Sequence, residues 1–443
     1  MNRVGSLIIA ALGLGLPLFG QAQRLSEQML PKYIGPGSCS ATACHGGVQP
    51  RNITHVQQNE YSTWAVQDSH SKAYRSLENP ISQRMGRLLG IAHPEASSKC
   101  LVCHALSIPE SQRGREFDLS EGVSCESCHG PASAWLGPHS EKNSKISQFT
   151  SLGMYDLADL QRRSEKCLTC HLGTPEKQVD HAMIAAGHPN LVFELDSYSA
   201  IQPPHWKPSP DPNQGVRLWS IGQAVQLREA LRRLQRRAQS PNWPEYSELD
   251  CYSCHHSLTK PEESWRQARG YADRPPGAAP WNVAHYAVFR IVAKDVDAAS
   301  SQELESALRD VFAVTAKPAS DRTQISKAAA DASQVADTFI GKMKNADFSR
   351  ARTARLLSEI SRQGDSLAGD DALTAEQTTM ALDSLFISYS KQAADNSGVR
   401  AAIDGLFQEL QNPSVYSAPR FSAQMRKVNA ALQAAGISSV SGQ

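Results

Sequence analysis

The sequence predicts a mainly α-helical protein in two parts, a cysteine-rich N-terminal part and a C-terminal helical bundle. Two observations predict this division. All ten cysteines and all 14 histidines lie before residue 286, in segments rich in Gly, Pro and Ser with few long helices or strands. Beyond residue 290, apolar residues recur at helical spacing, with no Cys or His among them.

The N-terminal part contains five motifs in which two cysteines are followed directly by a histidine. Two residues separate the thiols in four motifs, and four residues separate them in the first, which runs from Cys39 to His45. Two thiols three residues apart lie on one side of a helical turn, and the next residue can turn its imidazole the same way. Cys-x-x-Cys-His is the attachment sequence of c-type haem. We expect haem attachment at Cys39, Cys44, Cys100, Cys103, Cys125, Cys128, Cys167, Cys170, Cys251 and Cys254, with proximal ligands His45, His104, His129, His171 and His255.

The five motifs use every cysteine of the chain. A zinc site groups cysteine pairs in twos and gives no reason for a histidine after each pair. A disulfide framework would not close as five tight local loops. We therefore expect five covalently bound haem c groups, stacked within short helices and loops, because each macrocycle is an apolar plate that can supply the missing core.

Residues 1–22 have the composition of a secretory signal peptide. Arg3 precedes an apolar segment from Leu7 to Phe19, and small residues lie before the expected cleavage point. We expect a periplasmic protein without an integral membrane span in its mature chain, although a retained N-terminal anchor is the alternative. The expected parts are a pentahaem domain at 23–290 and a helical bundle at 291–443.

Charge gives little support to nucleic-acid binding, because 45 basic residues nearly balance 44 acidic ones and no aromatic residues interleave the one basic run. That run holds arginines from Arg228 to Arg237, with Leu227, Leu231 and Leu234 on the other face of a predicted helix. It could dock an acidic redox partner. We favour a helix face that is solvated or turned toward haem propionates.

The C-terminal part has the pattern of five or six packed helices. Capping boxes predict helix starts at Ser300 and Thr374. We expect a structural bundle, and a partner-binding module is the alternative. The predicted core positions are Leu304, Leu308, Val311, Phe312, Phe339, Ile340, Met343, Leu356, Leu357, Ile360, Leu382, Leu385, Phe386, Tyr389, Ile403, Leu406, Phe407 and Leu410.

Three stretches resemble the cytochrome c-554 family of multihaem electron carriers. The resemblance covers about residues 33–205, extends loosely over 250–290, and is absent from the rest. Its motifs are Tyr33-Ile-Gly before Cys39, Trp64-x5-His70-Ser-Lys-Ala, and Gly122-Val-Ser-Cys125-Glu-Ser-Cys128-His129-Gly130-Pro131 followed by His139.

Nine histidines lie outside the motifs, all in the haem-bearing region, so many of them are expected to be distal ligands. The resemblance implies that His139 caps the haem of His45. It implies in the same way that His70 caps the haem of His171. A later histidine should cap the haem of His129, and among His181, His188 and His205 we favour His188.

Two haems have less certain partners in the sequence. The resemblance implies that the second haem can be five-coordinate, which would leave the iron of His104 open unless His55 or His93 closes it. For the fifth haem we choose His285. The alternative is His256, because adjacent histidines can reach two different haems.

These observations favour an electron-transfer protein with redox protein partners over an enzyme. One alternative is a reductase or oxidase of a small nitrogen or sulfur species at an open haem iron. The chain lacks the Cys-x-x-Cys-Lys site of pentahaem nitrite reductases. Another alternative is a docking subunit of a larger redox assembly.

Overall fold

The computed structural model describes residues 30–51, 53, 56–255, 278–317, 321–391, 396–412 and 415–437. Within these ranges the secondary structure is helical, with two isolated β-bridges and no strand. This confirms the predicted mainly α fold class. The expected signal peptide and the alternative ligands His55 and His256 lie outside the described residues. No helix in the described ranges is both long and apolar enough to cross a membrane.

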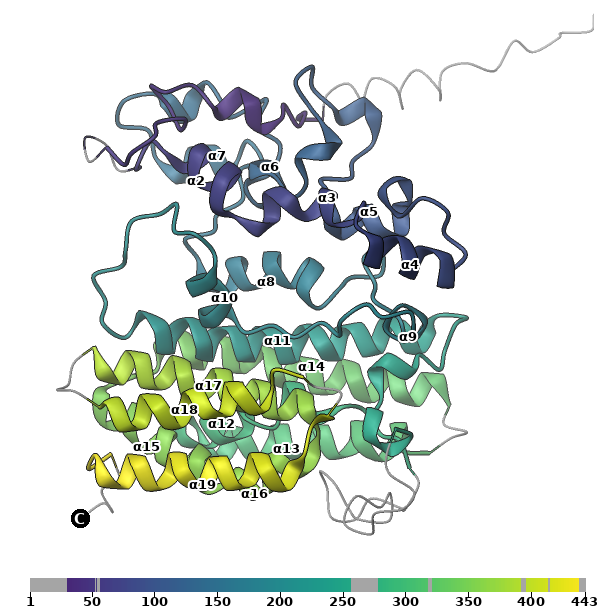
Figure 1. Cartoon of the computed structure of the whole chain (residues 1–443), viewed down its shortest axis with the longest axis vertical. Coiled ribbons are helices and arrows are strands. Elements are labelled where there is room, and N and C mark those ends of the chain that lie inside the picture. Colours follow the sequence, from purple (N-terminus) through teal and green to yellow (C-terminus); the bar gives the residue numbers. More distant parts are fainter. Residues whose placement is uncertain are drawn as a thin grey trace, which may run out of the picture.

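The N-terminal part consists of short helices and loops, drawn in purple and blue at the top of Figure 1. Its buried apolar clusters are small, such as the one formed by Leu77, Leu101 and Ala105. We expect bound haem to supply the rest of this core. The helices are α2 (Glu60–Gln67), α3 (Ala73–Ser76), α4 (Pro80–Leu88), α5 (Ser98–His104), α6 (Cys125–His129), α7 (Ile146–Thr150), α8 (Leu160–His171), α9 (His181–Ala185) and α10 (Leu195–Ile201).

Long helices stack in layers below this part (Figure 1). A single apolar cluster extends through them from Leu168 to Ile437. The core positions that the periodicity predicted are buried, Leu304, Phe339 and Leu385 among them, with one exception. Phe407 is 39% exposed, because the neighbouring Leu406 takes the buried position. The helices are α11 (Gln214–Gln239), α12 (Phe289–Val296), α13 (Ala298–Thr315), α14 (Arg322–Asn345), α15 (Arg350–Arg362), α16 (Gly364–Asp370), α17 (Ala372–Ser390), α18 (Ser397–Glu409) and α19 (Ala418–Ala434).

Helix α11 belongs to this helical body although it precedes the expected boundary at residue 290. It packs against α14, α8, α10 and α17. Val216, Trp219 and Leu227 on α11 are fully buried. Small and apolar residues on several sides let the helix be covered from more than one direction at once. The packing therefore joins α11 to helices far later in the chain.

Two helix starts differ from the prediction. The N-cap of α13 is Asp297, whose carboxylate accepts the backbone N–H of Ser300 at 3.0 Å. The N-cap of α17 is Asp371, which accepts the N–H of Thr374 at 2.7 Å. Aspartate caps as well as serine and threonine, and its negative charge also favours the positive end of the helix dipole. Each helix therefore starts three residues before its predicted capping box.

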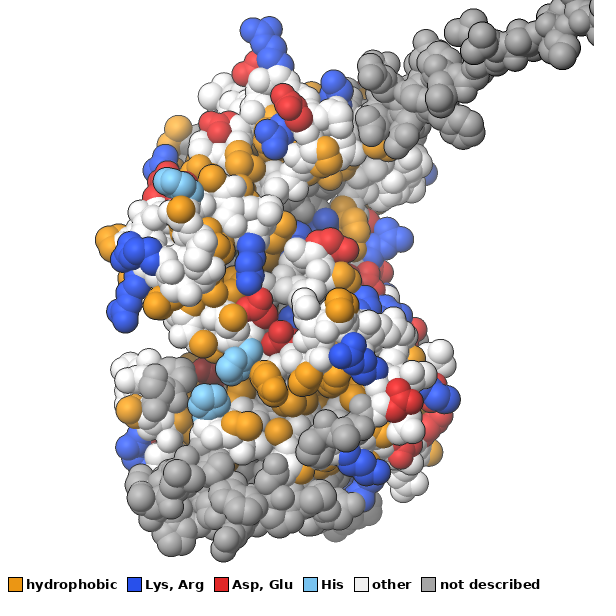
Figure 2. Space-filling model, turned by 90° about the vertical axis from the view of Figure 1, so that its right-hand side faces the viewer, with side chains coloured by type: hydrophobic (Ala, Val, Ile, Leu, Met, Phe, Trp, Pro, Cys, Tyr) orange, Lys and Arg blue, Asp and Glu red, His pale blue; other side chains and the backbone are white. Residues whose placement is uncertain are grey.

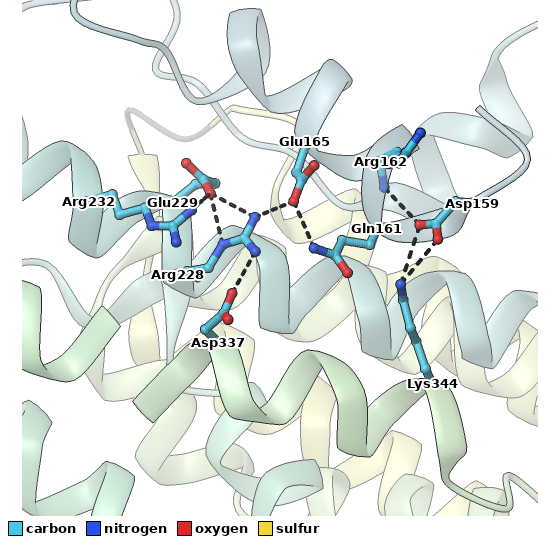
Figure 3. Close-up of polar contacts among 9 residues, drawn as sticks. All are labelled: Asp159, Gln161, Arg162, Glu165, Arg228, Glu229, Arg232, Asp337 and Lys344. Carbon is cyan, nitrogen blue, oxygen red and sulfur yellow. Dashed lines mark hydrogen bonds and ion pairs between the residues drawn. The ribbon is translucent and has the colours of Figure 1, made fainter. Parts of the chain in front are cut away.

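Arg228 of α11 joins three helices and is not a docking residue (Figure 3). Its side chain is only 3% exposed. It contacts Glu165 of α8 at 2.6 Å, Asp337 of α14 at 2.7 Å and its neighbour Glu229 at 2.8 Å. A buried guanidinium needs such partners, because desolvation without them is costly. The network fixes α8, which carries the fourth motif, onto the helical body.

Two further arginines of the basic run also point inward. Arg233 donates to the carbonyl of Leu172, the residue after the fourth motif, at 2.7 Å. Both Arg233 and Arg237 pair with the fully buried carboxylate of Glu248, three residues before the fifth motif. The expectation of a solvated helix face is therefore wrong for these residues. Their partners are a buried carboxylate and a backbone carbonyl of the protein itself.

The side view in Figure 2 shows a waist between the N-terminal part and the helical body. Histidine and hydrophobic side chains reach the surface near this level. The segments that cross between the two parts include α8, α9 and α10 (Figure 1). The fourth motif ends α8, and His181 begins α9.

Candidate haem-binding sites

Every motif histidine lies opposite one further histidine. The ring centres of each pair are separated by 6.2 to 6.5 Å. Most partners come from a distant segment of the chain. The pairs are His45 with His139 (6.2 Å), His171 with His70 (6.2 Å), His104 with His188 (6.4 Å), His129 with His205 (6.5 Å) and His255 with His181 (6.2 Å).

The common spacing fits a metal ion held between two imidazoles. A bond between a metal ion and an imidazole nitrogen is about 2 Å long, as at zinc sites. Two such bonds in line separate the ring centres by about 6 Å. Among the described residues, no group of three or more His, Cys, Asp or Glu side chains could hold a metal ion by itself. The candidate ligands meet in twos instead.

The cysteines are available for attachment, since all ten are free thiols. Motifs two, three and four lie at or near the C-terminal ends of α5, α6 and α8. The helical turn therefore sets the thiols and the histidine on one side, as the spacing predicted. The fifth motif begins in a short 3₁₀ helix, Cys251–Ser253.

Thiols of different motifs lie close together. Cys39 and Cys125, from the first and third motifs, are close enough for Cys125 to lower the pKa of the Cys39 thiol. Cys103 and Cys170, from the second and fourth motifs, are close in the same way, and Cys170 raises the pKa of Cys103. The motifs are therefore neighbours in space in an order that differs from their order in the chain.

The other ring nitrogen, Nδ1, has a partner in six of these histidines. His45 and His70 face carboxylates, whereas the others face neutral oxygens. These contacts set the orientation of each ring and direct Nε2 elsewhere. The distances from Nδ1 are 2.8 Å to Glu60 Oε2 for His45, 3.0 Å to Asp68 Oδ1 for His70, 3.0 Å to Ser76 Oγ for His104, 2.5 Å to the Leu136 carbonyl for His139, 2.8 Å to the Pro189 carbonyl for His188 and 3.3 Å to the Pro203 carbonyl for His205.

Burial keeps several of these imidazoles neutral, which is the form that binds metal. Desolvation lowers the pKa of His129 to about 4 and that of His171 to about 4. It also lowers the pKa of His188 and His205. These rings therefore carry a free lone pair at neutral pH.

The structure places His139 beside His45 and His70 beside His171, which is the pairing that the resemblance implied. The favoured pairing of His188 with His129 is not found. His188 lies beside His104. The second motif, for which we considered an iron with an open coordination position, therefore has a second histidine opposite its own. His205 lies beside His129 instead.

His285 is not placed as a partner of His255. Its buried ring receives a hydrogen bond at Nδ1 from the amide of Gln226 at 3.1 Å and lies near Trp281. Desolvation lowers its pKa to about 3. The residue opposite His255 is His181, at the start of α9. His93, another alternative, is exposed and contacts Glu95.

His181 and His205 had no distinguishing signal in the sequence, because both were simply histidines of the haem-bearing region. The Asp180 N-cap of α9 is the one local feature that fixes the direction of His181, since its carboxylate accepts the N–H of Met183 at 2.8 Å. The residues around Asp180 show that a helix begins at His181. They do not show which of the five motifs that helix lies against.

Residues 39–130 match the family model described as cytochrome c554 and c-prime, a stretch that holds the first three motifs. No curated protein matches the chain, and no solved structure matches it. The free thiols, neutral imidazoles and paired rings fit covalently held haem at these motifs. Together with the matched stretch, they support a c-type cytochrome with an electron-transfer role, exchanging electrons with redox partners.

Proposed function

We propose that the chain is a pentahaem c-type cytochrome that carries electrons between redox protein partners through bis-histidine haem sites. The observation that carries the proposal is the set of five ring pairs at 6.2 to 6.5 Å, one for each motif. When bound, haem c supplies reversible one-electron transfer at its iron.

The chain's own residues hold and orient the cofactors. The ten motif cysteines would attach them, and each motif histidine would supply one nitrogen ligand. The second nitrogen ligand would come from the histidine that lies opposite, which is His139, His188, His205, His70 and His181 for motifs one to five respectively.

The neighbouring thiols support a continuous series of sites. The first and third motifs touch through Cys39 and Cys125. The third and fourth are close enough for electrostatic interaction between Cys128 and Cys167. The fourth meets the second through Cys170.

The fifth site follows the second at the end of this series. Lys99 of α5 forms a 2.8 Å ion pair with Asp180, the residue before His181. This contact holds α9 against the helix that carries the second motif. The proposed order of sites is that of His45, His129, His171, His104 and His255.

The ring pairs favour electron transfer over small-molecule chemistry at an open iron, since His188 stands opposite His104. We further propose that the protein acts in the periplasm after export, where c-type haems are attached. The helical body supports the sites through α8 and α11. Its use as a docking element in a larger assembly is the other role we propose to test.

The test is the absorption spectrum of the dithionite-reduced holoprotein before and after addition of carbon monoxide, with haem quantified per chain. Five haems per chain and an unchanged spectrum are the expected result, because each iron has two histidines. A carbon monoxide shift amounting to one haem would contradict full ligation and indicate a reductase or oxidase. Fewer than five haems would contradict the pentahaem assignment.

A further inference from the structure

We infer that Glu60 and Asp68 are positioning residues that lower the reduction potentials of two of the five haem sites. Glu60 acts through His45, and Asp68 acts through His70. The inference rests on the proposed function, because it needs haem iron at these histidines. The inference goes beyond that function because it says which haem sites have lower reduction potentials than the others.

Glu60 is built into its position at the start of α2. Its Oε2 lies 2.8 Å from His45 Nδ1. Its Oε1 accepts the backbone N–H groups of Gln57 at 2.6 Å and Gln58 at 3.2 Å. The side chain is 14% exposed. Three N–H groups thus converge on the two oxygens of Glu60, an arrangement that suits a carboxylate, which only accepts hydrogen bonds.

Asp68 holds His70 in a similar way from the C-terminal end of α2. Its Oδ1 lies 3.0 Å from His70 Nδ1 and accepts the backbone N–H of the same residue at 2.9 Å. Its Oδ2 accepts from the amide of Gln202 at 3.3 Å. The side chain is 4% exposed, and all three of its contacts are with N–H groups. Such contacts suit a carboxylate held in a fixed position.

The other proposed ligands with an Nδ1 contact face neutral atoms. His104 faces the Ser76 hydroxyl and the Ala73 carbonyl. His188 and His205 face backbone carbonyls. The His104 and His129 sites therefore have no carboxylate at these contacts, which sets them apart from the sites of His45 and His70.

A carboxylate that accepts the Nδ1 proton makes an imidazole more basic and a stronger electron donor to its metal. It also places a negative charge near the iron, in surroundings where burial weakens solvent screening. Reduction from ferric to ferrous adds one electron and removes one positive charge, so both effects favour the ferric form. The reduction potential of a haem whose histidine contacts a carboxylate is therefore lower.

The two affected sites are the first and third in the proposed order. The His104 and His129 sites, with neutral partners, lie at higher potential. We therefore expect an alternation of low and high potentials over the first four sites. Electrons entering a partly reduced protein should rest on the His104 and His129 sites before the other two.

The experiment compares holoprotein variants Glu60→Gln and Asp68→Asn with the unmodified holoprotein. Each change keeps the size of the side chain and an oxygen acceptor but removes the charge. We expect the potential of one haem to rise in each variant, of a different haem in the two, and of both in the double variant. The readout is a potentiometric titration followed by absorbance.

Ser76→Ala is the matched control, because His104 keeps the Ala73 carbonyl at 3.1 Å as acceptor and no charge is removed. It should leave all five potentials near those of the unmodified protein. Unchanged potentials in both charge variants, with five haems retained, would overturn the inference. Haem counts below five before mutation would instead contradict the proposed function, so the two failures are distinguishable.

A measurement on the unmodified protein covers the case in which the variants lose haem. Ring planes near perpendicular give large-gmax electron paramagnetic resonance signals, and near-parallel planes give rhombic ones. Three pairs are near perpendicular, at 81° for His70 with His171, 88° for His104 with His188 and 76° for His129 with His205. One of these three large-gmax signals should disappear at a lower potential than the other two during reduction. Their disappearance at one common potential would refute the role of Asp68.

Discussion

At the residue scale, the fifth motif faces a different histidine from the one that we chose from the sequence. His181 faces His255 at 6.2 Å, whereas His285 is buried against Gln226 and Trp281. A histidine that binds iron and a histidine that only packs in the core look the same in a sequence. Only their surroundings in the folded protein distinguish them.

His181→Ala should convert one haem from low spin to high spin, because the iron would lose one axial nitrogen. His285→Gln should leave all five haems low spin. The check is the absorption spectrum of the oxidised protein in the high-spin region. A high-spin haem in the His285 variant and none in the His181 variant would reverse the assignment.

At the element scale, α8, α11 and α14 are joined by charge and by apolar packing. Leu168 of α8 and Leu231 of α11 are buried in the same cluster as Phe339 of α14. Arg228 adds contacts to carboxylates on all three helices. The arrangement keeps the fourth motif at a fixed place on the helical body.

Arg228→Ala should lower the free energy of unfolding by about 2 kcal/mol, since it leaves three carboxylates without their shared cation. This is less than the loss at a fully buried pair, because Glu165 and Asp337 are partly exposed, at 29% and 50%. Urea unfolding followed by far-ultraviolet circular dichroism measures the change.

Arg232→Ala is the matched control for that measurement. Arg232 lies on the same helix, is 41% exposed and pairs with Glu229 at i, i+3. An exposed pair of this kind contributes about 0.5 kcal/mol or less. Equal losses in the two variants would show that the Arg228 network does not join the helices as described.

At the scale of the whole molecule, the haem-bearing segments and the helical body share one apolar cluster. Leu168 and Leu172, at the fourth motif, belong to the same cluster as Phe421 and Leu432 near the C-terminus. The sequence, with its change of composition near residue 290, suggested that the two parts could be separated. Helix α11 crosses that boundary.

Truncation after residue 290 should therefore give an aggregated protein, even though all five motifs remain in the shortened chain. The cut would expose Leu227, Leu231 and Leu234 of α11, and each buried side chain of this kind contributes about 1.5–3 kcal/mol. Size-exclusion chromatography with haem quantified per chain is the measurement. Removal of residues 438–443 is the control, and a monomeric truncated protein with five haems would show that the parts fold independently.

The sequence by itself determined the five motifs, the expected attachment chemistry, the helical class and the buried positions of the C-terminal helices. Each of these depends on residues within one or two helical turns of each other, such as Cys167 and His171 or Leu304 and Leu308. Even so, it misplaced two helix starts, because aspartates three residues earlier cap as effectively.

Only the tertiary structure decided which histidine meets the second, third and fifth motifs and where the basic run points. His104 meets His188 across 84 residues of chain, and His129 meets His205 across 76. Such contacts depend on how helices pack, and residue spacing holds no information about packing. Arg228 became an internal residue for the same reason, since carboxylates from two other helices converge on it.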